Sequence, residues 1–225
     1  MLRADCLALP RYDETELDSV RAAFEPAPPL ALRQSWLAEP EADFQPGVVR
    51  VGCRDESLLV LAELTDADIF SRATRSNEKM WELGDTFEIF LRPIQQDAYM
   101  EFHVTPNNQR LQVRFPDGHA LEAARRTGDL APFLLAGDLI HTSVWHQSDA
   151  RRWLVYARIP AAAVCDRSRP LAGQEWLFSF SRYDYTRGRP QPVLSSTSFH
   201  ARLDFHSKAE WGKLTFRPGP SIQRD

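Results

Sequence analysis

The chain contains few cysteines and few glycines. Its 225 residues include three cysteines, Cys6, Cys53 and Cys165, and ten glycines. The cysteines are odd in number, far apart and never spaced as C-x-x-C, which argues against a disulfide framework and against a zinc site. The glycines form neither a G-x-G-x-x-G loop nor a G-x-S-x-G turn. The sequence therefore contains no motif for dinucleotide binding and no nucleophile elbow.

Long apolar runs and basic stripes are also missing. No segment approaches the ~18 apolar residues of a membrane helix, and the start of the chain lacks the apolar stretch of a signal peptide. We expect no membrane partner, and a cytoplasmic protein, or an extracellular one if a leader has been removed. The net charge is −4, with both signs interspersed. No basic stripe follows a phosphate backbone, so we expect no nucleic-acid partner. The oligomeric state is left open.

Aromatic residues are abundant, with 13 Phe, 6 Trp and 5 Tyr. Such side chains suit a pleated, half-buried surface and favour strands. Many short apolar or alternating segments separated by turn residues predict an all-β, antiparallel β-sandwich (jelly-roll-like) with few short helices. Only residues 160–165 look helical. The predicted strands are residues 48–53, 58–64, 85–91, 99–104, 110–115, 139–147, 152–159, 176–185 and 211–217.

The first 45 residues differ from the rest of the chain. They carry the cluster Glu25-Pro26-Ala27-Pro28-Pro29, and proline is confined to edges within a sheet. We therefore predict that residues 1–45 form an extension that packs on the sandwich as loop and one edge strand. Residues 46–220 are predicted to form the sandwich itself.

Strand periodicity predicts which side chains share a face. Phe87, Ile89 and Leu91 alternate with polar positions and are assigned to the core, which turns Glu88 outward. The inward set of the next strand is Met100, Phe102 and Val104, so Tyr99, Glu101 and His103 face outward beside Glu88. For residues 110–115 we assign Leu111, Val113 and Phe115 to the core and Arg110, Gln112 and Arg114 to the outer face. Residues 176–185 bury Phe178 and Phe180 and turn Ser179, Ser181 and Tyr183 outward.

This outer face combines carboxylate, imidazole, guanidinium and aromatic groups. Carboxylates accept hydrogen bonds from sugar hydroxyls, Arg and His donate to them, and aromatic faces cover apolar C–H surface. The other interpretation is a solvated face of cross-strand ion pairs such as Glu88 with Arg114, because half-wet antiparallel sheets are common. Periodicity alone leaves both interpretations open.

Three segments carry a resemblance to a known family. Residues 81–91, W-E-L-G-D-T-F-E-I-F-L, resemble the W-x-x-D-S-V-E-I-F segment of family 9 carbohydrate-binding modules, with one extra residue before the Asp. Residues 102–108, F-H-V-T-P-N-N, are similar to a strand in which the family has a sugar-binding Arg. Residues 205–214 are similar to its closing segment, aromatic–x₅–aromatic–G-x-L. The three lie in the family's order within residues 62–216.

The resemblance implies a β-sandwich, related to DOMON-type domains, that holds a sugar between two aromatic rings. Trp81 would be one ring, and Phe205 stands where the family has a second Trp. Glu88 matches the hydroxyl-binding Glu, and His103 stands where the family has Arg. The two departures from the family, Phe205 for Trp and His103 for Arg, imply either altered specificity or a degenerate site. The resemblance also implies a structural calcium, although the chain shows no clustered Asp/Asn loop for it.

We predict a non-catalytic domain that binds a mono- or oligosaccharide, with no cofactor. The alternative is a protein-interaction or scaffold domain of the same fold, which should bury Trp81 rather than expose it in a groove. No catalytic motif is present, and Asp85 and Glu88 should point to opposite faces, unlike a glycosidase pair. The scattered histidines form no metal-ligand spacing. The predicted ligand-binding residues are Trp81, Glu88, His103, Asn107, Arg182 (from an arginine-rich turn, residues 182–190) and Phe205.

Overall fold

Strands dominate the computed structural model, which describes residues 1–165 and 170–218. Within these residues the strands are β1 (Arg3–Ala8), β2 (Leu30–Ala31), β3 (Gly47–Arg54), β4 (Ser57–Thr65), β5 (Thr86–Pro93), β6 (Tyr99–Val104), β7 (Arg110–Phe115), β8 (His141–Gln147), β9 (Arg152–Pro160), β10 (Glu175–Asp184), β11 (Val193–Ser196) and β12 (Gly212–Phe216). The α-helices are α1 (Leu17–Phe24) and α2 (Gly118–Thr127). Short 3₁₀ turns are η1 (Met80–Glu82), η2 (Ala131–Phe133), η3 (Ser148–Ala150), η4 (Ala161–Ala163) and η5 (Lys208–Glu210). The predicted all-β sandwich and its nine predicted strands are confirmed.

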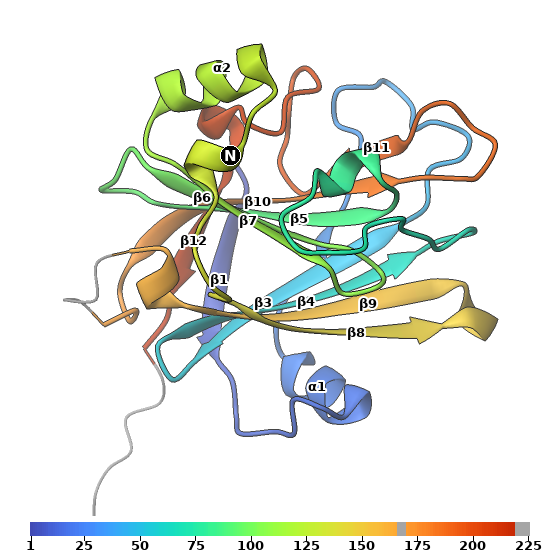
Figure 1. The fold of residues 1–225 in the computed structure, drawn as a ribbon. Coiled ribbons are helices and arrows are strands. Elements are labelled where there is room, and N and C mark those ends of the chain that lie inside the picture. The colour runs from blue at the N-terminus through green and yellow to red at the C-terminus, as the bar shows by residue number, and fades with distance from the viewer. Residues whose placement is uncertain (166–169, 219–225) are drawn as a thin grey trace, which may run out of the picture.

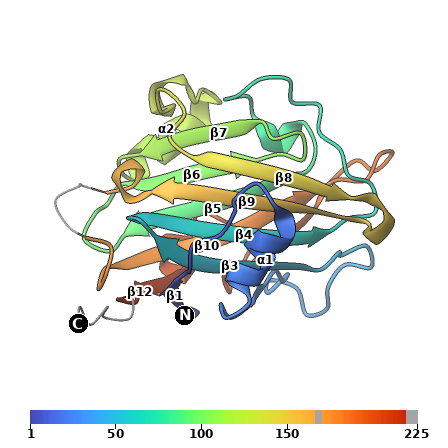
Figure 2. The same ribbon diagram turned by 90° about the horizontal axis from the view of Figure 1, so that it is seen from below.

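Two layers face each other across the main core (Figures 1 and 2). The strand order is β7-β6-β5-β10-β12-β1-β3-β4-β9-β8, with β11 paired to β10 and β2 to β3. We call β7-β6-β5-β10-β12 with β11 sheet A, and β3-β4-β9-β8 with β2 sheet B. Phe87, Ile89 and Phe102 of sheet A lie with Val60 and Val155 of sheet B in one buried cluster. The predicted core assignment of β5, β6 and β10 is therefore confirmed.

The N-terminal strand joins the two sheets. Arg3–Cys6 pair in parallel with Lys213–Phe216 of β12, and Leu7 and Ala8 pair in parallel with Gly52 and Cys53 of β3. The extension therefore contributes more than the one edge strand predicted for it, and the sandwich is not wholly antiparallel. The proline cluster does precede an edge strand, β2, which pairs only with β3. Segment β1 itself carries no proline, so nothing in it prevents ladder pairing on both sides.

The helices cover the outer sides of the sheets, α1 on sheet B and α2 on sheet A (Figure 1). Val20 and Phe24 of α1 pack on Leu59 and Leu61, which explains why β4 is apolar on both faces. Neither helix was predicted. The signals for α2 are the side chain of Asp117, which accepts a hydrogen bond from the Ala120 N–H, and Gly128, which ends the helix at φ +67°. None of the helices in the described part of the chain is long and apolar enough to cross a membrane.

The predicted facing of β7 was wrong. His103 pairs with Leu111 and Glu101 with Val113, so the apolar side chains of β7 lie on the outer side of sheet A. They are buried there because α2 and η2 cover this edge; the rings of Phe115 and Phe133 lie 5.1 Å apart. The polar side chains of β7 face the other way and close one end of the sandwich, where Gln112 bonds to the backbone of Gly137 and Leu139.

A single methyl group tests how tightly β12 packs. A Cβ on Gly212 would lie 2.7 Å from Cε1 of the buried Phe178 ring, whereas a Cβ on Gly118 would meet nothing within 4 Å. We expect Gly212→Ala to lower the free energy of unfolding by about 1–3 kcal/mol, because an overpacked core must shift a ring or a strand. Gly118→Ala is the matched control and should be neutral or slightly stabilising. Equal effects of the two variants in urea unfolding would contradict this packing.

Candidate functional site

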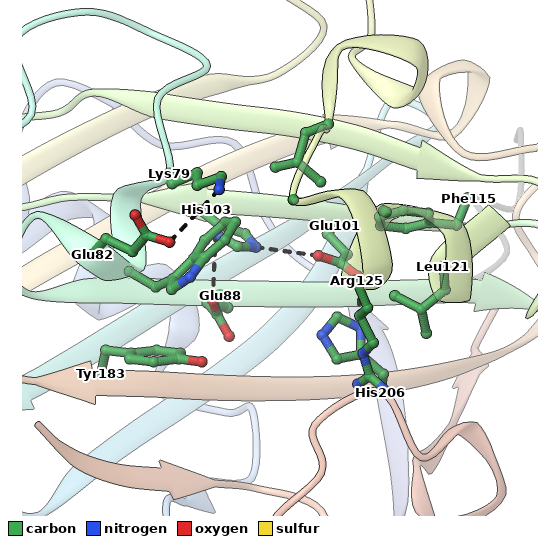
Figure 3. Close-up of a pocket in the computed structure, with 14 residues that line it drawn as sticks. Lys79, Glu82, Glu88, Glu101, His103, Phe115, Leu121, Arg125, Tyr183 and His206 are labelled. Atoms are coloured by element: carbon green, nitrogen blue, oxygen red, sulfur yellow. Dashed lines mark ion pairs between the residues drawn. The ribbon is translucent and has the colours of Figure 1, made fainter.

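A pocket of about 410 Å³ opens on the outer face of sheet A, beneath α2 (Figure 3). Its floor comes from β5 and β6, and its sides from η1, β10, α2 and the segment before β12. The lining residues that matter below are Trp81, Glu88, Glu101, His103, Arg125, Tyr183 and His206. Its size is in the usual range for a small-molecule site. Because helix and loop cover this face, polar side chains that would be solvated on an open sheet are buried here.

The floor is a chain of acids and imidazoles. His103 Nδ1 lies 3.4 Å from Glu88 Oε1, and His103 Nε2 lies 3.4 Å from Glu101 Oε2. His206 Nδ1 lies 2.9 Å from Glu101 Oε1 and 3.0 Å from the Tyr99 hydroxyl. Strand register explains the first part of this chain, because Glu88 pairs directly with His103. His206 is added from the segment that precedes η5.

The buried Glu101 and the half-buried His206 form an ion pair. Burial alone would raise the pKa of Glu101, but the positive charge of His206 and the His103 imidazole lower it well below its ordinary value. Burial would in turn lower the pKa of His206, and the charge of Glu101 outweighs that effect and raises it. Each group thus favours the charged form of the other.

Glu88 has no such partner. Burial raises its pKa to about 7, because the attraction of His103 and His206 offsets the effect of burial only in part and nearby Glu101 adds to it. Its residue is 3% exposed, and within residues 1–165 and 170–218 its carboxylate accepts no hydrogen bond. Figure 3 shows the carboxylate between His103 and Tyr183. The pocket floor thus holds one carboxylate that a ligand is free to contact.

Two half-buried aromatic side chains, Trp81 and Tyr183, line the pocket together with Glu88. The Trp81 ring meets the His103 ring edge-on at 5.5 Å. The Trp81 backbone is held by the Tyr185 hydroxyl, which donates to its carbonyl at 2.6 Å. Burial and the charge of Glu88 raise the pKa of Tyr183. These rings give the pocket apolar surface beside its acidic floor.

Three of the six predicted binding residues meet in this pocket: Trp81, Glu88 and His103. Phe205 is 5% exposed, and its ring lies behind Tyr183 at 5.9 Å; it lines a smaller neighbouring pocket of about 220 Å³. The amide of Asn107 is used within its turn, where it donates to the Ala73 carbonyl at 2.6 Å and accepts from the Thr105 hydroxyl. Neither Phe205 nor Asn107 lines the pocket that holds the other three.

The prediction that Arg182 belongs to an exposed arginine-rich turn was wrong. Arg182 lies within β10 opposite Phe87, on the inner side of sheet A, and is fully buried. Its guanidinium donates to the Thr65 carbonyl at 2.6 Å and to Asp66 at 2.9 Å, and lies 3.2 Å from Asp184. An arginine at an inward-facing strand position predicts a turn, but here the carboxylates of Asp66 and Asp184 balance its buried charge.

Several residues that line the pocket are not among the binding residues predicted from the sequence. Glu101 and Tyr183 were placed on this face by periodicity but given no role. Arg125 lies on α2, which was not predicted, although its cap and glycine stop are visible in the sequence. His206 had no periodic signal, because it lies outside any strand or helix.

The calcium implied by the family resemblance finds no suitable donors at the best candidate cluster, Asp66, Asp85 and Asp184. Their oxygens come within 4.8 Å of one another. Both oxygens of Asp85 already accept backbone N–H groups, of Phe70 and Tyr185, each at 2.7 Å. Arg182 supplies the positive charge, and burial with the charge of Asp66 raises the pKa of Asp85 to about 8. Calcium prefers ionised, uncommitted oxygens, so this cluster does not fit it.

The fold is that of family 9 carbohydrate-binding modules. A family 9 module from Caldicellulosiruptor kristjanssonii, solved with cellotriose, superposes with a TM-score of 0.62 at 17% identity, covering 100% of this chain and 96% of that one. The glucose-bound structure gives 0.62 and 17%, with coverages of 98% and 97%. A structure from Bacteroides uniformis, described as a candidate carbohydrate-binding protein, gives 0.72 and 14%, with 96% and 99%. No protein-family model and no curated protein matches the sequence.

The burial of Glu88 has a measurable cost. Because its folded-state pKa is raised from 4.5 to about 7, the folded protein holds this proton more tightly than the unfolded chain. Its contribution to stability is therefore present at low pH and is lost as the pH rises from about 4.5 through about 7. We expect the free energy of unfolding of Glu88→Gln to exceed that of the parent at pH 8 by on the order of 1–3 kcal/mol, with little difference near pH 4.5. Thermal unfolding at the two pH values measures this, and the variant should unfold at the higher temperature at pH 8.

The control is Glu82→Gln, which removes an exposed carboxylate at the mouth of the same pocket. It should shift thermal unfolding little at either pH, as exposed charges do. A Glu88→Gln protein less stable than the parent at pH 8 would show that the Glu88 charge is stabilised in the fold.

Proposed function

We propose that this protein binds a sugar without chemical conversion, in the pocket between Trp81 and Tyr183. The observation that carries the proposal is Glu88, a buried carboxylate that has no hydrogen-bond partner among the residues that the structure describes and lines the same pocket as Trp81 and Tyr183. Aromatic faces cover the C–H surface of a pyranose, and the carboxylate accepts hydrogen bonds from its hydroxyls. The similar structures that were solved with glucose and with cellotriose support the same ligand class.

In this proposal Tyr183 takes the place predicted for Phe205. Phe205 lies behind Tyr183 and is nearly inaccessible, so it supports the second ring without providing it. His103 lines the floor between Glu88 and Glu101, where its imidazole bonds either an acid or a ligand hydroxyl. Trp81, Glu88, His103 and Tyr183 are thus the proposed binding residues.

The geometry favours binding over hydrolysis. Glycoside hydrolysis uses two carboxyl groups that both reach the scissile bond. Glu101 is engaged by His103 and His206, and its lowered pKa disqualifies it as a general acid. Asp85 lies on the inner side of the sheet, hydrogen-bonded to Phe70 and Tyr185, as the strand alternation predicts. This leaves Glu88 as the available carboxylate of the pocket floor, while Glu82 at the mouth pairs with Lys79.

The alternative of a scaffold domain with a degenerate site is less well supported. A scaffold should bury Trp81, whereas here the side chain is half-buried and lines an open pocket. The exposure of this one ring is therefore the observation that separates the two functions.

Replacing Trp81 tests the proposal. Calorimetric titration with glucose, xylose, cellobiose, xylobiose, cellotriose and glucuronate should give saturable binding of at least one sugar. In Trp81→Ala the affinity for that sugar should fall about tenfold or more, since one aromatic contact contributes about 1.5 kcal/mol. Trp145→Ala is the matched control, because Trp145 is a half-buried Trp of β8 in the other sheet and should leave binding intact.

Either of two results would sink the proposal. Folded parent protein that binds none of these sugars supports the scaffold function instead. Equal loss of affinity in Trp81→Ala and Trp145→Ala would place the sugar elsewhere or reflect general loss of structure, which circular dichroism of the two variants distinguishes.

A further inference from the structure

Charge around the pocket is balanced everywhere except at Glu88. The Lys79 ammonium lies 3.8 Å from Glu82, and the Arg125 guanidinium donates to Asp204 at 2.8 Å. His206 is paired with Glu101 at 2.9 Å. Each cation that lines the pocket is thus matched to its own carboxylate within the described part of the chain. Glu88 is the acid left over.

The one group beside Glu88 cannot neutralise it fully. His103 lies 3.4 Å from Glu88 and 3.4 Å from Glu101, so one imidazole is shared between two carboxylates. A neutral imidazole has a single N–H and can donate to only one of them. The pKa of Glu88 is raised mainly by burial, and the attraction of His103 and His206 offsets this only in part.

The walls around this carboxylate also suit a cation. Trp81 and Tyr183 line the same pocket, and the electron-rich faces of such rings attract ammonium groups. A desolvated carboxylate and aromatic rings in one cavity form a site for an ammonium group. An anionic ligand would meet Glu88 unshielded, and both exposed cations of the pocket would first have to break their own ion pairs.

We propose that the pocket selects sugars that carry an ammonium group over neutral and anionic sugars, with the ammonium bound to Glu88. This inference rests on the proposed sugar binding and adds the ligand class. The remaining hydroxyls and ring carbons of the sugar then contact His103 and the faces of Trp81 and Tyr183. A neutral sugar fits the same space and lacks the charge-assisted hydrogen bond to Glu88.

Matched sugars and a matched variant pair test this selection. Glucose, glucosamine, 6-amino-6-deoxyglucose and glucuronate are titrated calorimetrically into the full-length protein at pH 7 and low salt. One of the two amino sugars should bind about tenfold tighter than glucose, and glucuronate should bind more weakly than glucose. In Glu88→Gln the amino sugar and glucose should bind with about equal affinity, because the charge that favours the amino sugar is gone. Glu82→Gln, which removes the exposed acid at the mouth, should retain the preference.

The outcomes separate this inference from the proposed function. If glucose binds and neither amino sugar binds tighter, ammonium selection is wrong and sugar binding stands. If an amino sugar is preferred equally by the parent and by Glu88→Gln, another group binds the ammonium and the assignment to Glu88 is wrong. If the folded protein binds none of the four sugars, both proposals fall together.

Discussion

Covering the outer face of sheet A is the constraint on which the rest of the structure depends. A sheet of this kind commonly leaves one face in water, where glutamates and histidines are solvated and titrate normally. Here α2 and the segment before β12 exclude that water over part of β5, β6 and β10. The same covering makes the apolar side of β7 a second core, fixes the ion pair of Glu101 with His206, and leaves Glu88 buried beside a single imidazole, His103, that it shares with Glu101.

The sequence allowed most of this fold to be predicted, because strand alternation is a local signal. Phe87, Ile89 and Leu91 faced the core as expected, and Glu88, His103 and Tyr183 shared the other face. The prediction failed where tertiary covering decides the outcome. In β7 both phases are compatible with burial, and only the positions of α2 and η2 determine that Leu111 and Val113 face outward. The prediction for Arg182 failed for a related reason, since its buried partner Asp66 is far away in sequence.

The site was half predictable for similar reasons. Glu88 and His103 lie opposite each other in neighbouring strands, which periodicity and register reveal. Residues contributed by irregular segments, such as His206, have no period to reveal them. Phe205 shows the limit of transferring a role along a motif, because its position in the motif is kept while its ring packs against Tyr183 and does not line the pocket. The wall of the pocket is therefore set by packing between segments, which no single segment encodes.

The placement of β1 bears on how the chain reaches this structure. Strand β1 pairs along most of its length with β12, the described strand farthest from it in the sequence, and through Leu7 and Ala8 with β3. Contacts between such distant segments require closure of nearly the whole chain and are associated with slow folding. On the ribosome, every strand of sheet B is synthesised before β12, so β1 can dock on β3 before β12 is present. The bridge between the two sheets then closes only after β12 has been synthesised, and the pocket on sheet A, with His206 just ahead of β12, is completed at the same stage.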